Sequence, residues 1–220
     1  TLAQNLSRFR STGGYPGVIG VNLGKNKDTL NENALDDYRL CYEQLYSLTD
    51  FATINVSSPN TQGLRALQET EELRTILRGM KTAQARLADQ YGKYVPLSVK
   101  IAPDLTELQL QAIAQLAMDE KIDAITATNT TIGRETVADL PYGQESGGLS
   151  GAPLFSRSNQ IIRSLAKLLD GALPIIGVGG VMSGADAKLK LDWGASLVQF
   201  YTGLIYRGPQ LVTESIKSCS

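Results

Sequence analysis

The sequence predicts an α/β protein built on a parallel sheet, and three observations support this. Short apolar runs, rich in β-branched residues, alternate along the chain with longer segments that have helical periodicity. Each run is nearly continuous in apolar residues, which is typical of a strand buried on both faces of a parallel sheet. Hydrophobic residues make up 42% and charged residues 20% of the 220 positions, so the chain can bury a large core.

Six apolar runs predict six strands. They lie at residues 18–24, 51–58, 95–101, 124–130, 173–180 and 196–203. The segments between the runs predict helices. Within 68–90, apolar residues recur at Leu73, Ile76, Leu77 and Met80, which is the spacing of one helix face.

The later helices carry signals at their ends. Thr106 and Gln109 have the spacing of a capping box before an apolar pattern, and Ser183 opens another helical segment. Between them, the apolar positions of 161–169 predict a helix that Gly171 would terminate. The chain begins in polar, helix-like sequence rather than in a strand.

The order of strands and helices implies right-handed crossovers, with the helices outside the sheet. A complete (β/α)8 TIM barrel has eight strands and typically about 250 residues. We therefore expect residues 1–220 to form one domain, a partial barrel that supplies about six C-terminal βα units. A doubly wound open sheet is the alternative, but the sequence VNLGKNK at the first run is not the usual glycine fingerprint of that fold.

Composition excludes several classes of function. Lys and Arg total 21 and Asp and Glu total 22, so the net charge of −1 gives no sign of a nucleic-acid-binding surface. The chain has no histidine, and Cys41 and Cys219 lie far apart, so we expect no metal site and two reduced thiols. No apolar run has the length of a membrane span, and the first residues lack the apolar segment of a signal peptide.

Polar residues follow the predicted strands. In a barrel the carboxyl ends of the strands form the active-site face, so these side chains should converge on one mouth. The set comprises Asn22, Asn55, Ser58, Asn60, Thr61, Lys100, Thr128, Asn129, Thr130, Tyr201 and Thr202. Neutral amides, hydroxyls and a lysine favour a planar ligand rich in heteroatoms over the two-carboxylate site of a glycosidase.

The last two runs carry a second signal. Gly179 and Gly180 follow the fifth run, and Tyr201 and Thr202 follow the sixth. Barrels of this kind bind phosphate at this place through free backbone N–H groups. The alternative is that the glycines serve only tight βα turns. Equally, Lys100 could extend its amine to solvent, and the Asn and Ser residues could be turn formers.

Five motifs occur in order between about Gly20 and Pro209. They are Asn55-Val-Ser-Ser-Pro-Asn-Thr-Gln-Gly-Leu-Arg65, Ser98-Val-Lys-Ile-Ala-Pro-Asp104, Thr128-Asn-Thr-Thr131, Gly147-Gly-Leu-Ser-Gly151 and Pro174-Ile-Ile-Gly-Val-Gly-Gly180. Together they resemble the dihydroorotate dehydrogenase family, and in particular its class 2, quinone-linked members. The resemblance implies FMN-dependent oxidation of dihydroorotate to orotate in de novo pyrimidine biosynthesis, with the electrons passed to a quinone.

The resemblance also implies residue roles. Ser58 stands where class 2 members carry the base that takes the C5 proton, whereas class 1 members have cysteine there; the C6 hydride goes to the flavin. Thr61 would assist Ser58, and Lys100 would stabilise the reduced flavin. FMN contacts are implied for Asn22, Asn55, Lys100, Thr128, Gly151, Gly179, Gly180, Tyr201 and Thr202, and substrate contacts for Asn55, Asn60, Asn129 and Thr130.

Family members have further sequence upstream of the region that this chain matches. It carries two barrel strands, a lysine that touches flavin and substrate, a substrate loop and, in class 2, a helical segment for the quinone and the membrane. We therefore expect a longer polypeptide or a separate N-terminal part. We expect the whole protein to be a peripheral membrane protein, either on the cytoplasmic face of a bacterial inner membrane or at the mitochondrial inner membrane. The alternatives are another phosphate-binding TIM-barrel enzyme, such as a sugar-phosphate lyase or isomerase, and a non-catalytic fragment.

Overall fold

Six strands form one parallel sheet in which the spatial order follows the chain order. The computed structural model describes residues 1–13, 16–61 and 63–219. The strands are β1 (Gly20–Gly24), β2 (Phe51–Asn55), β3 (Leu97–Ile101), β4 (Ala124–Ala127), β5 (Ile175–Val178) and β6 (Leu197–Gln199). Every run expected to be a strand contains one, so this prediction is confirmed.

Helices connect the strands. They are α1 (Leu2–Ser11), α2 (Ala34–Leu45), α3 (Thr70–Tyr91), α4 (Glu107–Asp119), α5 (Phe155–Leu169), α6 (Gly184–Asp192), α7 (Thr202–Arg207) and α8 (Gln210–Cys219). Short 3-10 turns lie at Asn31–Asn33, Tyr46–Leu48, Leu64–Gln68 and Ala152–Leu154. The polar start of the chain is helical, as expected.

The helix ends follow the sequence signals closely. The hydroxyl of Thr106 accepts from the backbone N–H of Gln109, and the Gln109 side chain accepts from the backbone N–H of Thr106, which confirms the capping box. At the start of α6 the Ser183 hydroxyl accepts from the backbone N–H of Asp186, a single side-chain cap. At the end of α5, the residue expected to terminate the helix, Gly171, lies one position beyond the observed C-cap. Asp170 takes the left-handed cap position with φ 44°, and Gly171 follows it with φ 80°.

The sheet curls, so its two faces differ in character. Ile54, Val99 and Ile125 are fully buried beneath the helices on the outer face and belong to the apolar core. The alternate positions face the inside of the curl and include hydroxyls, among them Ser98 and Thr126, whose oxygens are 2.6 Å apart. The strands therefore alternate more than the nearly continuous apolar runs suggest, because small hydroxyl residues occupy the inner positions.

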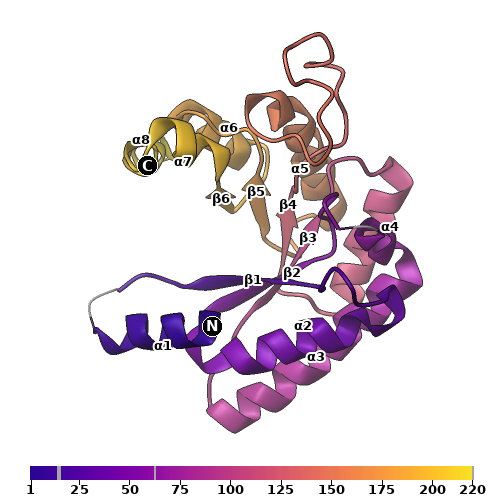
Figure 1. Cartoon of the computed structure of the whole chain (residues 1–220), viewed down its shortest axis with the longest axis vertical. Coiled ribbons are helices and arrows are strands. Elements are labelled where there is room, and N and C mark those ends of the chain that lie inside the picture. The colour runs from indigo at the N-terminus through magenta and orange to yellow at the C-terminus, as the bar shows by residue number, and fades with distance from the viewer. Residues whose placement is uncertain (14–15, 62, 220) are drawn as a thin grey trace.

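Within the described part of the chain, β1 and β6 are the edges of the sheet, since each pairs with a single neighbouring strand. Figure 1 shows the sheet curling as an open barrel, with α2, α3, α4 and α5 outside it and the segment between β4 and α5 projecting as a long loop. Among the described residues, no helix combines the length and the apolar character that crossing a membrane requires. Within the same ranges, no three His, Cys, Asp or Glu side chains gather as a metal site needs.

Candidate active site

The carboxyl ends of β2, β3 and β4 bring polar side chains into one row. Asn55 is in register with Lys100 on the neighbouring strand, and Lys100 is in register with Thr126 on the next. Thr128 and Asn129 follow directly, where the chain leaves β4. The structure therefore brings these residues together at neighbouring strand ends, as the sequence predicts.

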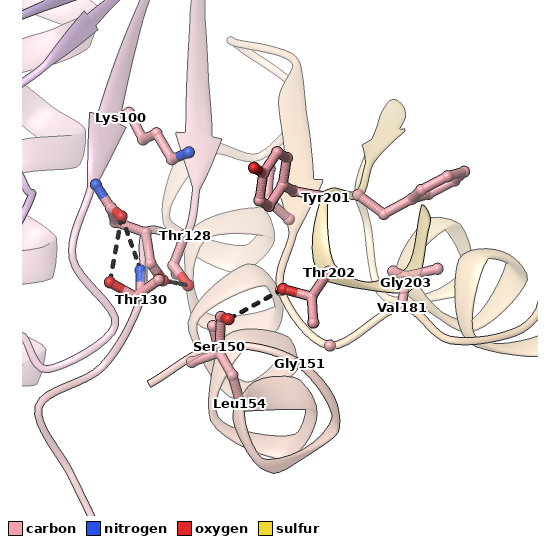
Figure 2. A pocket seen from close by; sticks show the side chains of 15 residues that line it. Lys100, Thr128, Thr130, Ser150, Gly151, Leu154, Val181, Tyr201, Thr202 and Gly203 are labelled. Carbon is pink, nitrogen blue, oxygen red and sulfur yellow. Dashed lines mark hydrogen bonds between the residues drawn. The ribbon is translucent and has the colours of Figure 1, made fainter. Parts of the chain in front are cut away.

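A cavity of about 280 Å³ lies at this mouth, between β3, β4, β5 and the segment that follows β6. Among the residues that the structure describes, its lining contains Lys100 but no carboxylate (Figure 2). The lining residues are Lys100, Thr128, Asn129, Thr130, Ser150, Gly151, Leu154, Val178, Gly179, Gly180, Val181, Phe200, Tyr201, Thr202 and Gly203. A neutral-to-positive lining of this kind suits an anionic, heteroatom-rich ligand.

Lys100 supplies the positive charge of the cavity. Its side chain is largely buried, and Figure 2 shows its amine directed toward the space bordered by Thr128 and Tyr201. Removal from water lowers the pKa of the Lys100 amine. The amine therefore faces the cavity rather than bulk solvent, which was the alternative interpretation, and an anionic ligand would oppose the lowering of its pKa.

Asn55, Ser57 and Asn129 form a hydrogen-bonded triangle beside the cavity. The Asn129 amide nitrogen donates to Asn55 Oδ1 at 3.0 Å and lies 3.1 Å from Ser57 Oγ, which itself is 3.2 Å from Asn55 Oδ1. Asn129 Oδ1 accepts from the backbone N–H of Thr130 at 2.9 Å. The phenol of Tyr38, on α2, donates to the Asn55 carbonyl at 2.9 Å and anchors the end of β2. These contacts orient both amide side chains.

The loop after β2 carries Ser58 and Asn60. Ser58 Oγ accepts from the backbone N–H of Asn60 at 3.3 Å, so the turn role considered for this serine is present. Asn60 Oδ1 accepts from the backbone N–H of Gly148 at 3.1 Å, which ties this loop to the long loop after β4. A Cβ on Gly148 would lie 2.9 Å from Pro59 Cγ in the loop after β2, so glycine at this position allows the two loops to approach this closely.

A second wall of the cavity is built from turns near β5 and β6. Gly179 and Gly180 have φ values of 117° and 76°. A Cβ on Gly180 would lie 2.5 Å from the Phe155 backbone, so the turn needs glycine for packing as well as conformation. Opposite this turn, Thr202 Oγ1 donates to Ser150 Oγ at 3.0 Å and joins the start of α7 to the Gly147–Gly151 motif (Figure 2).

An ion pair that the sequence reasoning did not assign holds three strand-end loops together. Arg65 lies 2.7 Å from Asp104, and its other guanidinium nitrogens donate to the carbonyls of Ser57 at 3.2 Å and Thr130 at 2.8 Å. Asp104 also accepts from the hydroxyl of Thr131 and from the backbone N–H of Ile132. Arg65 and Asp104 are the last residues of two of the sequence motifs, and this position was the feature of the sequence that could have indicated a role for them.

The expected site residues fall into two groups. Those that line the cavity are Lys100, Thr128, Asn129, Thr130, Gly151, Gly179, Gly180, Tyr201 and Thr202. Those outside its lining are Asn22, Asn55, Ser58, Asn60 and Thr61. Asn55 and Asn60 touch the lining or its loops, whereas Asn22 is exposed on β1, opposite Thr53. In the described ranges no hydrogen bond joins Thr61 to Ser58, so the assisting role of Thr61 stays a prediction.

The comparisons with known proteins agree on one family. Residues 2–219 match the family model described as dihydroorotate dehydrogenase. The chain belongs to the dihydroorotate dehydrogenase family. The dihydroorotate dehydrogenase (quinone) of Thiobacillus denitrificans is 56% identical over 214 residues, which are 97% of this chain and 64% of the relative. The protein of the same name from Chromobacterium violaceum is 55% identical over 217 residues, which are 99% of this chain and 62% of the relative. These names confirm the resemblance to class 2.

Solved structures of the family have the same fold. A crystal structure of DHODH from Eimeria tenella in complex with ferulenol matches with a TM-score of 0.91 and 36% identity, over 99% of this chain and 62% of that chain. The ligand-free form from the same organism matches with a TM-score of 0.90 and 37% identity, over 98% of this chain and 64% of that chain. The expected TIM-barrel class is thereby confirmed, and the chain spans 62–64% of the length of these four proteins.

Proposed function

We propose that this chain forms the larger part of an FMN-dependent dihydroorotate dehydrogenase, which oxidises dihydroorotate to orotate and passes the electrons to a quinone. The observation that carries the proposal is the cavity itself. Lys100, which is partly buried, the oriented amide of Asn129 and a positive-φ glycine turn share one lining that contains no carboxylate among the described residues. Membership of the family argues against the alternative of a sugar-phosphate lyase or isomerase.

The residues present fit FMN. Its phosphate matches the positive-φ turn at Gly179 and Gly180 and the start of α7, which line the cavity at the place where barrels of this kind bind phosphate. The Lys100 amine suits the polar edge of the flavin ring, where negative charge develops on reduction. When bound, FMN supplies the two-electron acceptor chemistry. The protein residues bind and orient it.

The substrate side of the proposal rests on the triangle of Asn55, Ser57 and Asn129. Amide groups locked by neighbours present fixed donors and acceptors to a planar carboxylated ring, at little entropic cost. Asn60 and Thr130 complete this polar edge from the two loops that Gly148 brings together. These contacts are assigned to dihydroorotate and orotate.

Ser58 is assigned as the base. A serine hydroxyl is a weak base at its ordinary pKa, so it needs donors that stabilise the oxyanion. The backbone N–H of Asn60 is such a donor, because it already points at Ser58 Oγ. Ser58 Oγ would then take the C5 proton of the substrate while the hydroxyl proton of Ser58 passes to a hydrogen-bonded acceptor in a relay. Thr61, in the same loop, is assigned to assist the transfer.

Quinone reduction and peripheral contact with a bacterial or mitochondrial inner membrane are part of the same proposal. They are supported by the quinone-linked names of the relatives.

The test is spectroscopic. The full-length native polypeptide should bind FMN and absorb near 450 nm, roughly where flavins absorb, and dihydroorotate should bleach that band without oxygen. A quinone analogue should then restore it. If the polypeptide binds FMN but dihydroorotate does not bleach the flavin band, the assignment of dihydroorotate as the substrate is wrong. A polypeptide that binds a sugar phosphate and no flavin would disprove the whole proposal.

A further inference from the structure

Directly behind the glycine turn, outside the cavity lining, lies a fully buried lysine. Lys190, on α6, has no exposed surface. Its amine donates to Ser158 Oγ at 3.0 Å and to Asn159 Oδ1 at 2.8 Å, and it lies 5.2 Å from the ring centroid of Phe155. All three partners belong to the first turns of α5. A buried ammonium held by neutral groups is costly and calls for an explanation.

The lysine is connected to the turn through one side chain. Ser158 Oγ, which accepts from Lys190, donates to the carbonyl of Val178, the residue immediately before the two glycines. The Ser158 side chain also lies 2.9 Å from the position that a Cβ on Gly179 would take. The lysine stem packs close to the strand, with its Cδ 3.2 Å from the corresponding position on Gly177. Lys190 and Ser158 therefore pack against this turn, and Ser158 connects Lys190 by hydrogen bonds to the residue that precedes it.

The charge of Lys190 is poorly balanced within the chain. Burial lowers the pKa of the Lys190 amine to about 7. The charge of Asp186, on the same helix, raises this pKa to a smaller extent. Asn159 Nδ2, on the same side chain that accepts from the amine, is buried and has no hydrogen-bond partner among the described residues. An apolar side chain of similar volume would cost less at this position, so a packing role alone does not account for a lysine here.

We propose that Lys190 is a positioning residue for the anionic end of the ligand in the cavity. Through Ser158 it holds the Val178–Gly180 turn in the shape that faces the ligand, and its positive charge attracts a phosphate from behind that turn. The inference rests on the proposed function in one respect, namely that the anion is the phosphate of FMN. The lysine itself does not touch the ligand.

The experiment compares two flavins that differ only in the phosphate. Dissociation constants of FMN and of riboflavin are measured by fluorescence quenching on the full-length polypeptide and on its Lys190→Met variant. We expect FMN binding to weaken by about 3- to 30-fold, the range for a residue that acts on a ligand without touching it, and riboflavin binding to change less than about 2-fold. The thermal midpoint of the ligand-free variant should fall, because Asn159 Oδ1 loses its buried donor, and the riboflavin measurement separates this loss of stability from the loss of phosphate binding.

The matched control is Lys188→Met. Lys188 lies on the same helix, but it is exposed and paired with Asp192 at 2.7 Å, so neither flavin should bind differently. Equal losses for FMN and riboflavin, or no loss of FMN binding in Lys190→Met, would overturn the proposal. If Lys190→Met does not fold, Ser158→Ala replaces it, since that variant removes the connection to Val178 and keeps the charge.

A second measurement is independent of the cofactor. Backbone amides of residues 178–180 should exchange hydrogen faster in the ligand-free Lys190→Met and Ser158→Ala variants than in the unchanged protein. Unchanged exchange at these amides in both variants would disprove the positioning role even if FMN does not bind. Failure of the unchanged protein to bind FMN, with faster exchange in the variants, would instead count against the proposed function alone.

Discussion

The amide nitrogen of Asn129 lies 3.0 Å from Oδ1 of Asn55, although the two residues are 74 positions apart in the chain. One follows β4 and the other ends β2, and the strand between them carries Lys100 in register with Asn55. The contact therefore joins two strand ends across a third. It gives the amide side chains one orientation before any ligand arrives.

Replacing Asn129 with Asp should disturb this contact at nearly constant volume. A carboxylate oxygen would face Asn55 Oδ1, which is an acceptor, so the two groups would repel one another. We expect kcat/KM for dihydroorotate to fall by about 10²-fold, as for a lost buried hydrogen bond and a misplaced charge. Steady-state kinetics on the full-length polypeptide measure it. Asn5→Asp on the exposed face of α1 is the control, and equal activity of the two variants would contradict the assignment.

Ser58→Ala should retain FMN and lose most turnover. Removal of a general base typically costs about 10²- to 10⁴-fold in rate. Stopped-flow flavin reduction by dihydroorotate isolates this step, and Ser58→Cys should keep part of the activity because a thiol can also accept the proton. Flavin reduction at the unchanged rate in Ser58→Ala would leave Ser58 with only its turn contact to Asn60.

Lys100→Ala should weaken FMN retention and slow flavin reduction together, by about 10-fold or more each. The reason is that its charge acts more strongly on the reduced, anionic ring than on the oxidised one. Lys100→Arg should not restore full activity, because a guanidinium differs in shape and donor geometry. Lys27→Ala, an exposed lysine in the loop after β1, is the control. A Lys100→Ala enzyme with normal FMN binding and reduction would refute the role.

The ion pair of Arg65 and Asp104 should act on catalysis through loop position. Arg65→Lys keeps the charge but cannot reach Asp104, Ser57 and Thr130 at once, so we expect kcat to fall by about 10-fold with FMN binding retained. The pair of Arg39 and Asp36 is exposed, and Arg39→Lys is the matched control. Loss of FMN from Arg65→Lys, with normal kcat in the reloaded enzyme, would contradict this.

Residues 1–220 expressed by themselves should be poorly soluble, or should bind FMN weakly, and should not oxidise dihydroorotate. β1 and β6 each leave one edge unpaired, and unpaired edges promote association. An apolar groove of about 730 Å³ lies along β6 and α8, where Leu197 and Ile216 are 61% and 62% exposed. Dye reduction by dihydroorotate tests the prediction. A soluble, yellow and active preparation would show that it is wrong.

Most of the fold was predictable because it depends on patterns that are local in the chain. The capping box of Thr106 and Gln109 and the six strand runs are examples, since each is set by residues a few positions apart. The end of α5 was misplaced by one residue, because Asp170 tolerates the left-handed conformation that glycine usually takes. The polar inner row of the sheet was missed for a different reason. Its hydroxyls are small enough to leave the runs looking continuous.

The sequence by itself determined the parallel sheet and the residues at its strand ends, because the chain order of a βα protein dictates which ends meet. The tertiary structure alone decided which of these residues touch. Asn55 meets Asn129, Arg65 joins the carbonyl of Thr130 from 65 positions away, and Lys190 lies beneath the glycine turn. Such contacts depend on how the curled sheet and the outer helices pack. Local periodicity in the sequence does not predict these contacts, because the packing of segments far apart in the chain sets the distances between their side chains.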